Sequence, residues 1–145
     1  MKLCRIGELG KEKPGIIDKD GSYKDLSGEI SDLDPKNLNF KTIEKISKLK
    51  IKDLPTLDTD SRIGACVKNP SKFLGIGLNY KDHALEQNLP IPKEPIIFSK
   101  FTNCIIGPND NIEIPKNSKH TDWEVEIGFV IGKKAKYVEE KNALD

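Results

Sequence analysis

The sequence has little excess charge of either sign and no long apolar run. Its 24 Lys and Arg residues against 23 Asp and Glu residues give a formal net charge of +1. That balance offers no bulk electrostatic attraction to nucleic acid or to an anionic membrane. No apolar stretch approaches the roughly 20 residues that span a bilayer, and no apolar segment follows Met1 as it would in a secretory signal peptide. We therefore expect a cytoplasmic protein with no nucleic-acid or membrane partner.

Cysteine is also scarce. The three cysteines, Cys4, Cys66 and Cys104, are odd in number and far apart and form no C-x-x-C pair, so they predict no disulfide framework. Reduced and mostly buried thiols are the simpler expectation. The content of 36% hydrophobic and 32% charged residues is that of a globular chain rather than a disordered one.

The first part of the chain predicts a small mixed unit. Residues 2–6 and 15–18 have the composition of short strands, and Asp20-Gly21 follows the second one as a hairpin signal. Apolar residues then recur at helical spacing between Phe40 and Leu49, with Lys and Glu between them. We expect a small mixed domain over residues 1–65.

The second part, residues 66–145, is predicted to be β-rich. A helix is expected at 80–87, and strands are expected at 73–78, 96–98, 112–114 and 123–132. The last of these is the longest strand candidate. Together the two parts predict an α+β, β-rich fold.

An acidic alternation precedes and enters the last predicted strand. In an extended chain, side chains alternate between two faces. One face would carry His120, Asp122, Glu124 and Glu126, and the other Trp123, Val125 and Ile127. Like charges on one face repel unless a cation lies among them, and carboxylates are preferred ligands of Mg²⁺, Mn²⁺ and Ca²⁺. The pattern fits either a divalent-cation site or the solvated face of an amphipathic strand.

A second candidate lies in the predicted helix. His83 and Glu86 are three residues apart and would be neighbours on its surface. A carboxylate beside an imidazole raises its basicity, which suits a general base acting on water. The same spacing also fits an exposed helix pair with no catalytic role.

Several motifs occur in an order that resembles a known family. They are G-I-G-L-N-Y-K-D-H-A-L-E (75–86), P-I-I-F-S-K (95–100), G-P-N-D (107–110) and D-W-E-V-E-I-G-F-V-I-G-K (122–133). This set resembles the fumarylacetoacetate hydrolase family, in particular its acylpyruvate hydrolase-like and ureidoglycolate lyase-like members, over about residues 73–140. The resemblance implies a variable N-terminal domain followed by the first, truncated part of a mixed β-roll.

The resemblance also implies residue roles. Glu124 and Glu126 match the E-x-E pair that holds Mg²⁺ (or Mn²⁺ or Ca²⁺), and His83 with Glu86 matches the dyad that activates water. Lys100 matches a lysine lining the substrate pocket.

Three further residues match less closely. Tyr80 matches the family's pattern near the substrate, Asp122 fits a group that supports the ligands or caps the strand, and His120 is expected to be exposed. The family further implies a homodimer.

The implied substrate is a small 2-oxo or diketo acid, such as an acylpyruvate or fumarylacetoacetate-like compound, cleaved at a carbon–carbon bond. Alternatives within the family are a ureidoglycolate lyase-like, decarboxylase or 2-hydroxyhepta-2,4-diene-1,7-dioate isomerase-like reaction. Family members supply a third acidic ligand further along, and Asp145 comes too early to match it. We therefore also expect that the chain is a fragment or truncated product without full activity.

Overall fold

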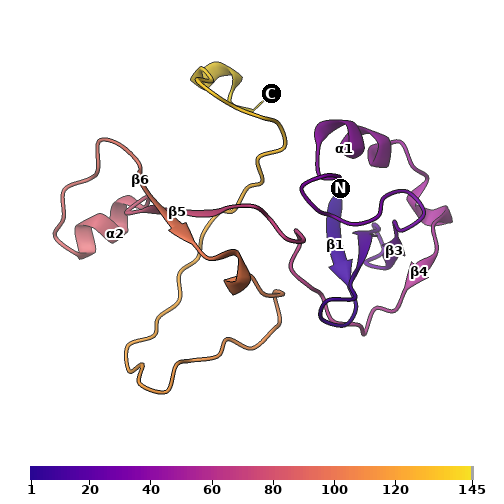
Figure 1. Ribbon diagram of the computed structural model, residues 1–145, viewed down its shortest axis with the longest axis horizontal. Helices are drawn as coiled ribbons and strands as arrows, with labels where there is room; N and C mark the ends of the chain where they lie inside the picture. The colour runs from indigo at the N-terminus through magenta and orange to yellow at the C-terminus, as the bar shows by residue number, and fades with distance from the viewer. Residues whose placement is uncertain (145) are drawn as a thin grey trace.

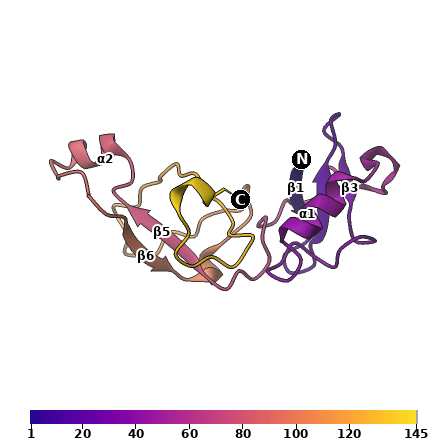
Figure 2. The same cartoon turned by 90° about the horizontal axis from the view of Figure 1, so that it is seen from above.

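The computed structural model describes residues 1–144, which form two antiparallel sheets and two short α-helices in an α+β arrangement. Figures 1 and 2 show the two sheets lying apart, joined by residues 58–72. Among these residues the helices and strands are β1 (Lys2–Ile6), β2 (Lys13–Ile17), β3 (Tyr23–Asp25), α1 (Phe40–Ser47), β4 (Thr56–Leu57), β5 (Phe73–Gly77), α2 (Lys81–Glu86) and β6 (Ile96–Lys100), with 3-10 turns η1 (Ile51–Asp53), η2 (Thr102–Cys104) and η3 (Glu140–Asn142).

The first sheet has the order β1-β2-β3-β4 and is antiparallel throughout. The predicted hairpin is confirmed: Ile17 pairs with Tyr23, and the N–H of Asp18 donates to the carbonyl of Ser22. Asp20 stabilises the turn by accepting hydrogen bonds from the backbone N–H and hydroxyl of Ser22.

Helix α1 covers this sheet, as the apolar spacing predicts. Asn39 caps its first turn, because the Asn39 side chain accepts a hydrogen bond from the N–H of Thr42. Ile46 is fully buried, whereas Phe40 is about half exposed. The core consists of Ile16, Leu26, Ile30, Leu33 and Ile46. Burying each such side chain stabilises the fold by about 1.5–3 kcal/mol.

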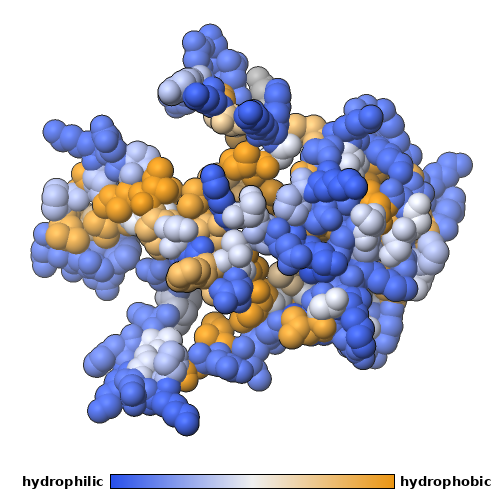
Figure 3. Space-filling view, in the orientation of Figure 1, coloured by the Kyte–Doolittle hydropathy of each residue, from blue (hydrophilic) through white to orange (hydrophobic). Residues whose placement is uncertain are grey.

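The second sheet is the hairpin of β5 and β6, both predicted from the sequence. Gly75 pairs with Phe98, and a side chain at Gly75 would collide with the Phe98 ring. The glycine at this position therefore leaves room for an aromatic ring from the neighbouring strand. Many apolar side chains on this side of the molecule remain exposed, as Figure 3 shows.

Two sequence expectations are wrong. Residues 112–114 and 123–132 form no strand, and Figure 1 shows both as coil. The reason is physical: a strand needs a hydrogen-bonded neighbour, and within residues 1–144 no segment pairs with either one.

The cysteine expectation is only partly right. Cys4 is buried in β1, but Cys66 and Cys104 are exposed. Cys66 lies in the connection between the sheets and Cys104 in the short turn η2, and neither segment has a layer packed over it.

Candidate functional site

Helix α2 carries the predicted dyad. β5 ends at Gly77, and the chain turns through Leu78 and Asn79 into α2, with Tyr80 at the helix N-cap position. Leu78 has φ of 48°, in the left-handed region that a non-glycine residue rarely adopts. Such conformations cost of order 1–3 kcal/mol and cluster at functional sites.

The dyad is not formed in this conformation. His83 Nε2 lies 2.7 Å from Gln87 Nε2, one turn further along, and the Glu86 carboxylate makes no hydrogen bond or ion pair within residues 1–144. The Gln87 side chain, rather than Glu86, is therefore the hydrogen-bond partner of the His83 imidazole. His83 is half-buried and Glu86 exposed on the same helix, so their side chains remain within reach of each other.

Glu124 and Glu126 lie in the irregular segment that follows residue 110. Both are exposed, and the apolar residues between and beyond them are exposed too, Trp123 at 77% and Ile127 at 81%. Within the described residues this segment belongs to no sheet, so its alternating acidic and apolar side chains do not lie on two opposite faces. Asp122 accepts a hydrogen bond from the backbone N–H of Trp123.

One long-range contact joins this segment to α2. The side-chain amide of Asn79, Nδ2, donates to Oε2 of Glu126 at 2.9 Å. Asn79 immediately precedes the N-cap of α2, so the contact brings one carboxylate of the E-x-E pair to the start of the helix that bears His83. Sequence reasoning missed Asn79, because a neutral amide between a strand and a helix has no distinguishing local pattern.

The remaining predicted site residues do not converge on a pocket. The Lys100 ammonium lies 5.5 Å from the ring centre of Phe73 and 5.8 Å from that of Phe98, a cation–π arrangement at the end of β6. Tyr80 is about 43% exposed, and His120 is exposed as expected. A shallow hollow of about 320 Å³ is lined by Asn79 and by the proline-rich loop 91–95, and none of the residues predicted for catalysis, substrate or metal lines it.

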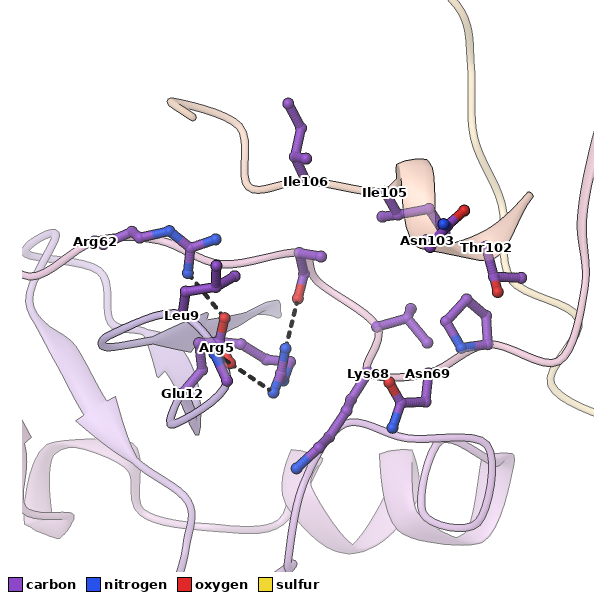
Figure 4. Close-up of a pocket in the computed structure, with 14 residues that line it drawn as sticks. Arg5, Leu9, Glu12, Arg62, Lys68, Asn69, Thr102, Asn103, Ile105 and Ile106 are labelled. Carbon is purple, nitrogen blue, oxygen red and sulfur yellow. Dashed lines mark hydrogen bonds and ion pairs between the residues drawn. The ribbon is translucent and has the colours of Figure 1, made fainter. Parts of the chain in front are cut away.

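A larger hollow of about 470 Å³ lies between the first sheet and the η2 turn (Figure 4). Its polar wall is a network of ion pairs. Arg5 donates to Asp32 at 2.7 Å and to Glu12 at 3.2 Å, and Arg62 donates to Glu12 at 2.8 Å. Arg62 also forms a two-pronged pair with Asp110, so it joins the first sheet to the turn after η2.

The carboxylates of this network are held ionised. Burial alone would raise the pKa of Asp32, but hydrogen bonds from Arg5 and Lys68 outweigh it and leave the pKa below its ordinary value. The same balance, dominated on the lowering side by Arg62, lowers the pKa of Glu12. The hydrogen bond from Arg62 likewise lowers the pKa of Asp110.

The charges in this network cancel. Arg5, Arg62 and Lys68 face the carboxylates of Glu12, Asp32 and Asp110. The guanidinium groups of Arg5 and Arg62 donate their N–H hydrogen bonds to these carboxylates and to backbone carbonyls. The hollow therefore offers no free charge to a ligand, and the pair of Arg62 with Asp110 links the first part of the chain to the second.

The donor chemistry of Glu124 and Glu126 suits a hard divalent cation. However, no group of three or more His, Cys, Asp or Glu side chains with metal-binding geometry occurs in the described part of the chain. The residues present do not form an assembled metal site.

Comparison with known proteins identifies the class. The model of the fumarylacetoacetate (FAA) hydrolase C-terminal family matches residues 72–145. That range contains every residue predicted above for catalysis, substrate and metal. The chain belongs to the fumarylacetoacetate hydrolase family.

The relatives agree with this assignment. Proteins named "Putative hydrolase" from Burkholderia lata and Burkholderia multivorans are 51% and 52% identical to it over 145 residues. Those matches cover all of this chain and 51% of each relative, so the chain spans about half the length of the curated relatives it matches. A crystal structure described as that of "a putative HpcE protein" from Mycobacterium smegmatis is 25% identical, with a TM-score of 0.58 over 81% of this chain and 42% of that one.

Among residues 1–144, neither helix has the length and apolar character that crossing a lipid bilayer requires.

Proposed function

We propose that this chain forms part of a divalent-metal-dependent hydrolase that cleaves a carbon–carbon bond in a β-diketo acid, of the acylpyruvate or fumarylacetoacetate type. The observation that carries the proposal is the family match over residues 72–145, which spans the His83–Glu86 pair and the Glu124–Glu126 pair in the family's order. The hydrogen bond between Asn79 and Glu126 supports it, because it brings Glu126 to the residue before the N-cap of the helix that carries His83 and Glu86.

In the proposed reaction, His83 takes a proton from water while the water oxygen bonds to a keto carbon of the substrate. Glu86 turns toward the imidazole and stabilises its charged form. The carbon–carbon bond then breaks, its electron pair remains on the departing fragment as an enolate, and the proton returns to that carbon. The Lys100 ammonium moves away from the rings of Phe73 and Phe98 and contacts a substrate oxygen.

Glu124 and Glu126 are the proposed ligands of Mg²⁺ (or Mn²⁺ or Ca²⁺), whose role when bound would be to offset negative charge on the substrate's oxygens. Two carboxylates alone leave several ligand positions to water or to groups outside residues 1–144. We therefore expect the 145-residue chain by itself to bind the cation weakly and to have little activity.

Other reactions of the family remain as alternatives. A lyase, a decarboxylase or an isomerase would use the same enolate-forming chemistry. Identifying the products decides among them: hydrolysis of an acylpyruvate gives pyruvate and a carboxylic acid, whereas isomerisation leaves the mass of the substrate unchanged.

A second candidate function is association without catalysis. The observation favouring it is the exposed apolar run from Trp123 to Ile131, in which the apolar residues are 54–82% exposed. Surfaces of this kind mark interaction sites, and a homodimer is the association we expect. Sedimentation of the purified chain at several concentrations distinguishes a monomer from such a dimer.

The decisive test is an acylpyruvate turnover assay with Mg²⁺ or Mn²⁺, run on the chain and on a full-length relative such as the Burkholderia multivorans protein. The relative should release pyruvate, and substituting the glutamate that aligns with Glu124 should remove most of that activity. If the relative turns over no diketo acid with either cation, the proposed reaction is wrong.

A further inference from the structure

Charges of opposite sign flank the two ends of the exposed apolar run. Three exposed carboxylates lie before its centre, and three exposed lysines follow it: Asp122, Glu124 and Glu126, then Lys133, Lys134 and Lys136. We propose that two copies of this chain associate by antiparallel pairing of residues 122–136 about a two-fold axis at Phe129. The proposal deepens the second candidate function, association of two copies, on which it rests, and it uses neither the cation nor the diketo acid.

The backbone of this segment is suited to a strand partner. Residues 120–132 contain no turn or bend, and residues 111–131 are all exposed. Among the described residues, no backbone–backbone hydrogen bond involves residues 119–138, so their N–H and C=O groups are available to another chain. Tyr137 has φ of 54°, in the left-handed region, so an extended strand ends before it.

Pairing centred on Phe129 brings opposite charges together. Positions equally far before and after Phe129 stand opposite each other, so Glu124 faces the partner's Lys134 and Asp122 faces the partner's Lys136. The two-fold axis repeats both pairs. Opposite charges directly across an antiparallel pair stabilise it, whereas a parallel pairing in register would set Glu124 against the partner's Glu124.

The same register matches apolar side chains. Phe129 faces the partner's Phe129, and Ile127 faces the partner's Ile131. Because side chains alternate between two faces of a strand, these apolar groups share one face and the carboxylates lie on the other. Cross-strand pairs of aromatic and β-branched residues add to the stability of the pairing.

One neighbouring register pairs as many charges. Centred on Val130, it sets Glu126 against the partner's Lys134, but Glu126 already accepts a hydrogen bond from Asn79 at 2.9 Å. The register centred on Phe129 leaves that hydrogen bond in place, because there Glu126 faces a glycine. The structure therefore favours the axis at Phe129.

The exposed area of the chain is large enough for such an interface. The chain exposes 12215 Å², whereas a compact monomer of 16.2 kDa exposes about 7,500 Å². A standard dimer interface removes about 800 Å² from each partner, which is well within the difference. Because the pairing joins strand edges, both faces of the resulting two-stranded ribbon stay open to water, and Trp123 stays accessible.

Sedimentation equilibrium of the purified 145-residue chain, with a chelator present, tests the proposal without any cation. The unsubstituted chain should form a dimer that dissociates on dilution. Lys134→Glu places like charges opposite each other twice in the interface and should weaken the dimer roughly tenfold. Lys116→Glu is the matched control, since it reverses an exposed lysine outside the paired segment, and it should leave the dimer unchanged.

A charge swap separates specific pairing from a general effect of charge. Glu124→Lys alone should weaken the dimer as Lys134→Glu does, and the double variant Glu124→Lys/Lys134→Glu should restore it. A dimer that is insensitive to Lys134→Glu, or is not restored by the swap, would overturn this pairing while association itself stands. A chain that stays monomeric up to roughly 1 mM would overturn both.

Cross-linking tests the register. In a chain with Cys66→Ser and Cys104→Ser, which removes the two exposed thiols, Phe129→Cys should form a disulfide-linked dimer when oxidised with diamide. Val130→Cys should link far less, because its own counterpart is not opposite it in this register. Preferred linking through position 130 would overturn the axis at Phe129.

Discussion

Removing Asp32 should destabilise the first sheet far more than removing an exposed charge. Asp32 is 5% exposed, and its carboxylate accepts hydrogen bonds from Arg5 Nε at 2.7 Å and from the backbone N–H of Leu33 at 2.8 Å. It also pairs with the Lys68 ammonium at 2.9 Å. Asp32→Ala would leave Arg5, itself 4% exposed, with Glu12 as its remaining carboxylate partner.

Breaking a buried pair on one side typically costs 3–5 kcal/mol, because the other charge is left buried and poorly compensated. Domains have a total free energy of unfolding of only 5–15 kcal/mol, so Asp32→Ala should lose a large part of it. The matched control is Glu44→Ala, which removes an exposed i,i+4 partner of Lys48 and should cost no more than about 0.5 kcal/mol.

Urea unfolding followed by far-ultraviolet circular dichroism measures both variants. Fluorescence of the single tryptophan does not serve here, because Trp123 lies in coil outside the first sheet. A loss below about 1 kcal/mol for Asp32→Ala, or one equal to that of the control, would refute the reasoning.

The pH dependence follows from the same network. The folded-state pKa of Asp32 lies below its ordinary value, which is about 3.9 in an unfolded chain. The stability it contributes is therefore fully present above the unfolded pKa and is lost as pH falls through the folded pKa. The unfolding midpoint in urea should thus hold from pH 7 to about pH 5 and fall below about pH 4, with a shallower fall in Asp32→Asn.

Three further outcomes are expected. In the folded chain, thiol labelling with iodoacetamide at neutral pH should modify Cys66 and Cys104 but not Cys4, because burial raises the pKa of the Cys4 thiol to about 11; rapid labelling of all three would contradict this. Trp123 emission should be that of a solvated indole and be readily quenched by acrylamide, and protection from quenching would show that the segment is covered in solution. In any relative that turns over acylpyruvate, substituting the histidine that aligns with His83 by alanine should slow turnover while leaving Mn²⁺ affinity unchanged; unchanged turnover would return His83 to a structural role.

Local signals explain why much of the first sheet could be predicted. The Asp20-Gly21 turn and the apolar spacing from Phe40 to Leu49 each specify their structure within a few residues, and both are confirmed. Strands β5 and β6 were also predicted from short apolar runs, although their pairing with each other was not.

Features that depend on distant residues were not predictable in this way. Arg5 and Asp32 are 27 residues apart, and nothing in either local sequence indicates that they pair. The period-two pattern of residues 123–132 correctly describes what a strand there would look like, but a strand forms only with a neighbour, and the described residues supply none. The candidate site was likewise predictable only in part. The sequence motifs predicted His83 and Glu126 as site residues, whereas the contact of Asn79 with Glu126 is visible only in the folded chain.

The most direct test of the central claim, that Glu124 and Glu126 are the cation ligands, is a calorimetric titration of Mg²⁺ and Mn²⁺ into the purified chain. We expect weak binding, with a dissociation constant on the order of a millimolar for so few protein ligands, that disappears in the double variant Glu124→Gln/Glu126→Gln. Binding of equal strength in the double variant would contradict the account.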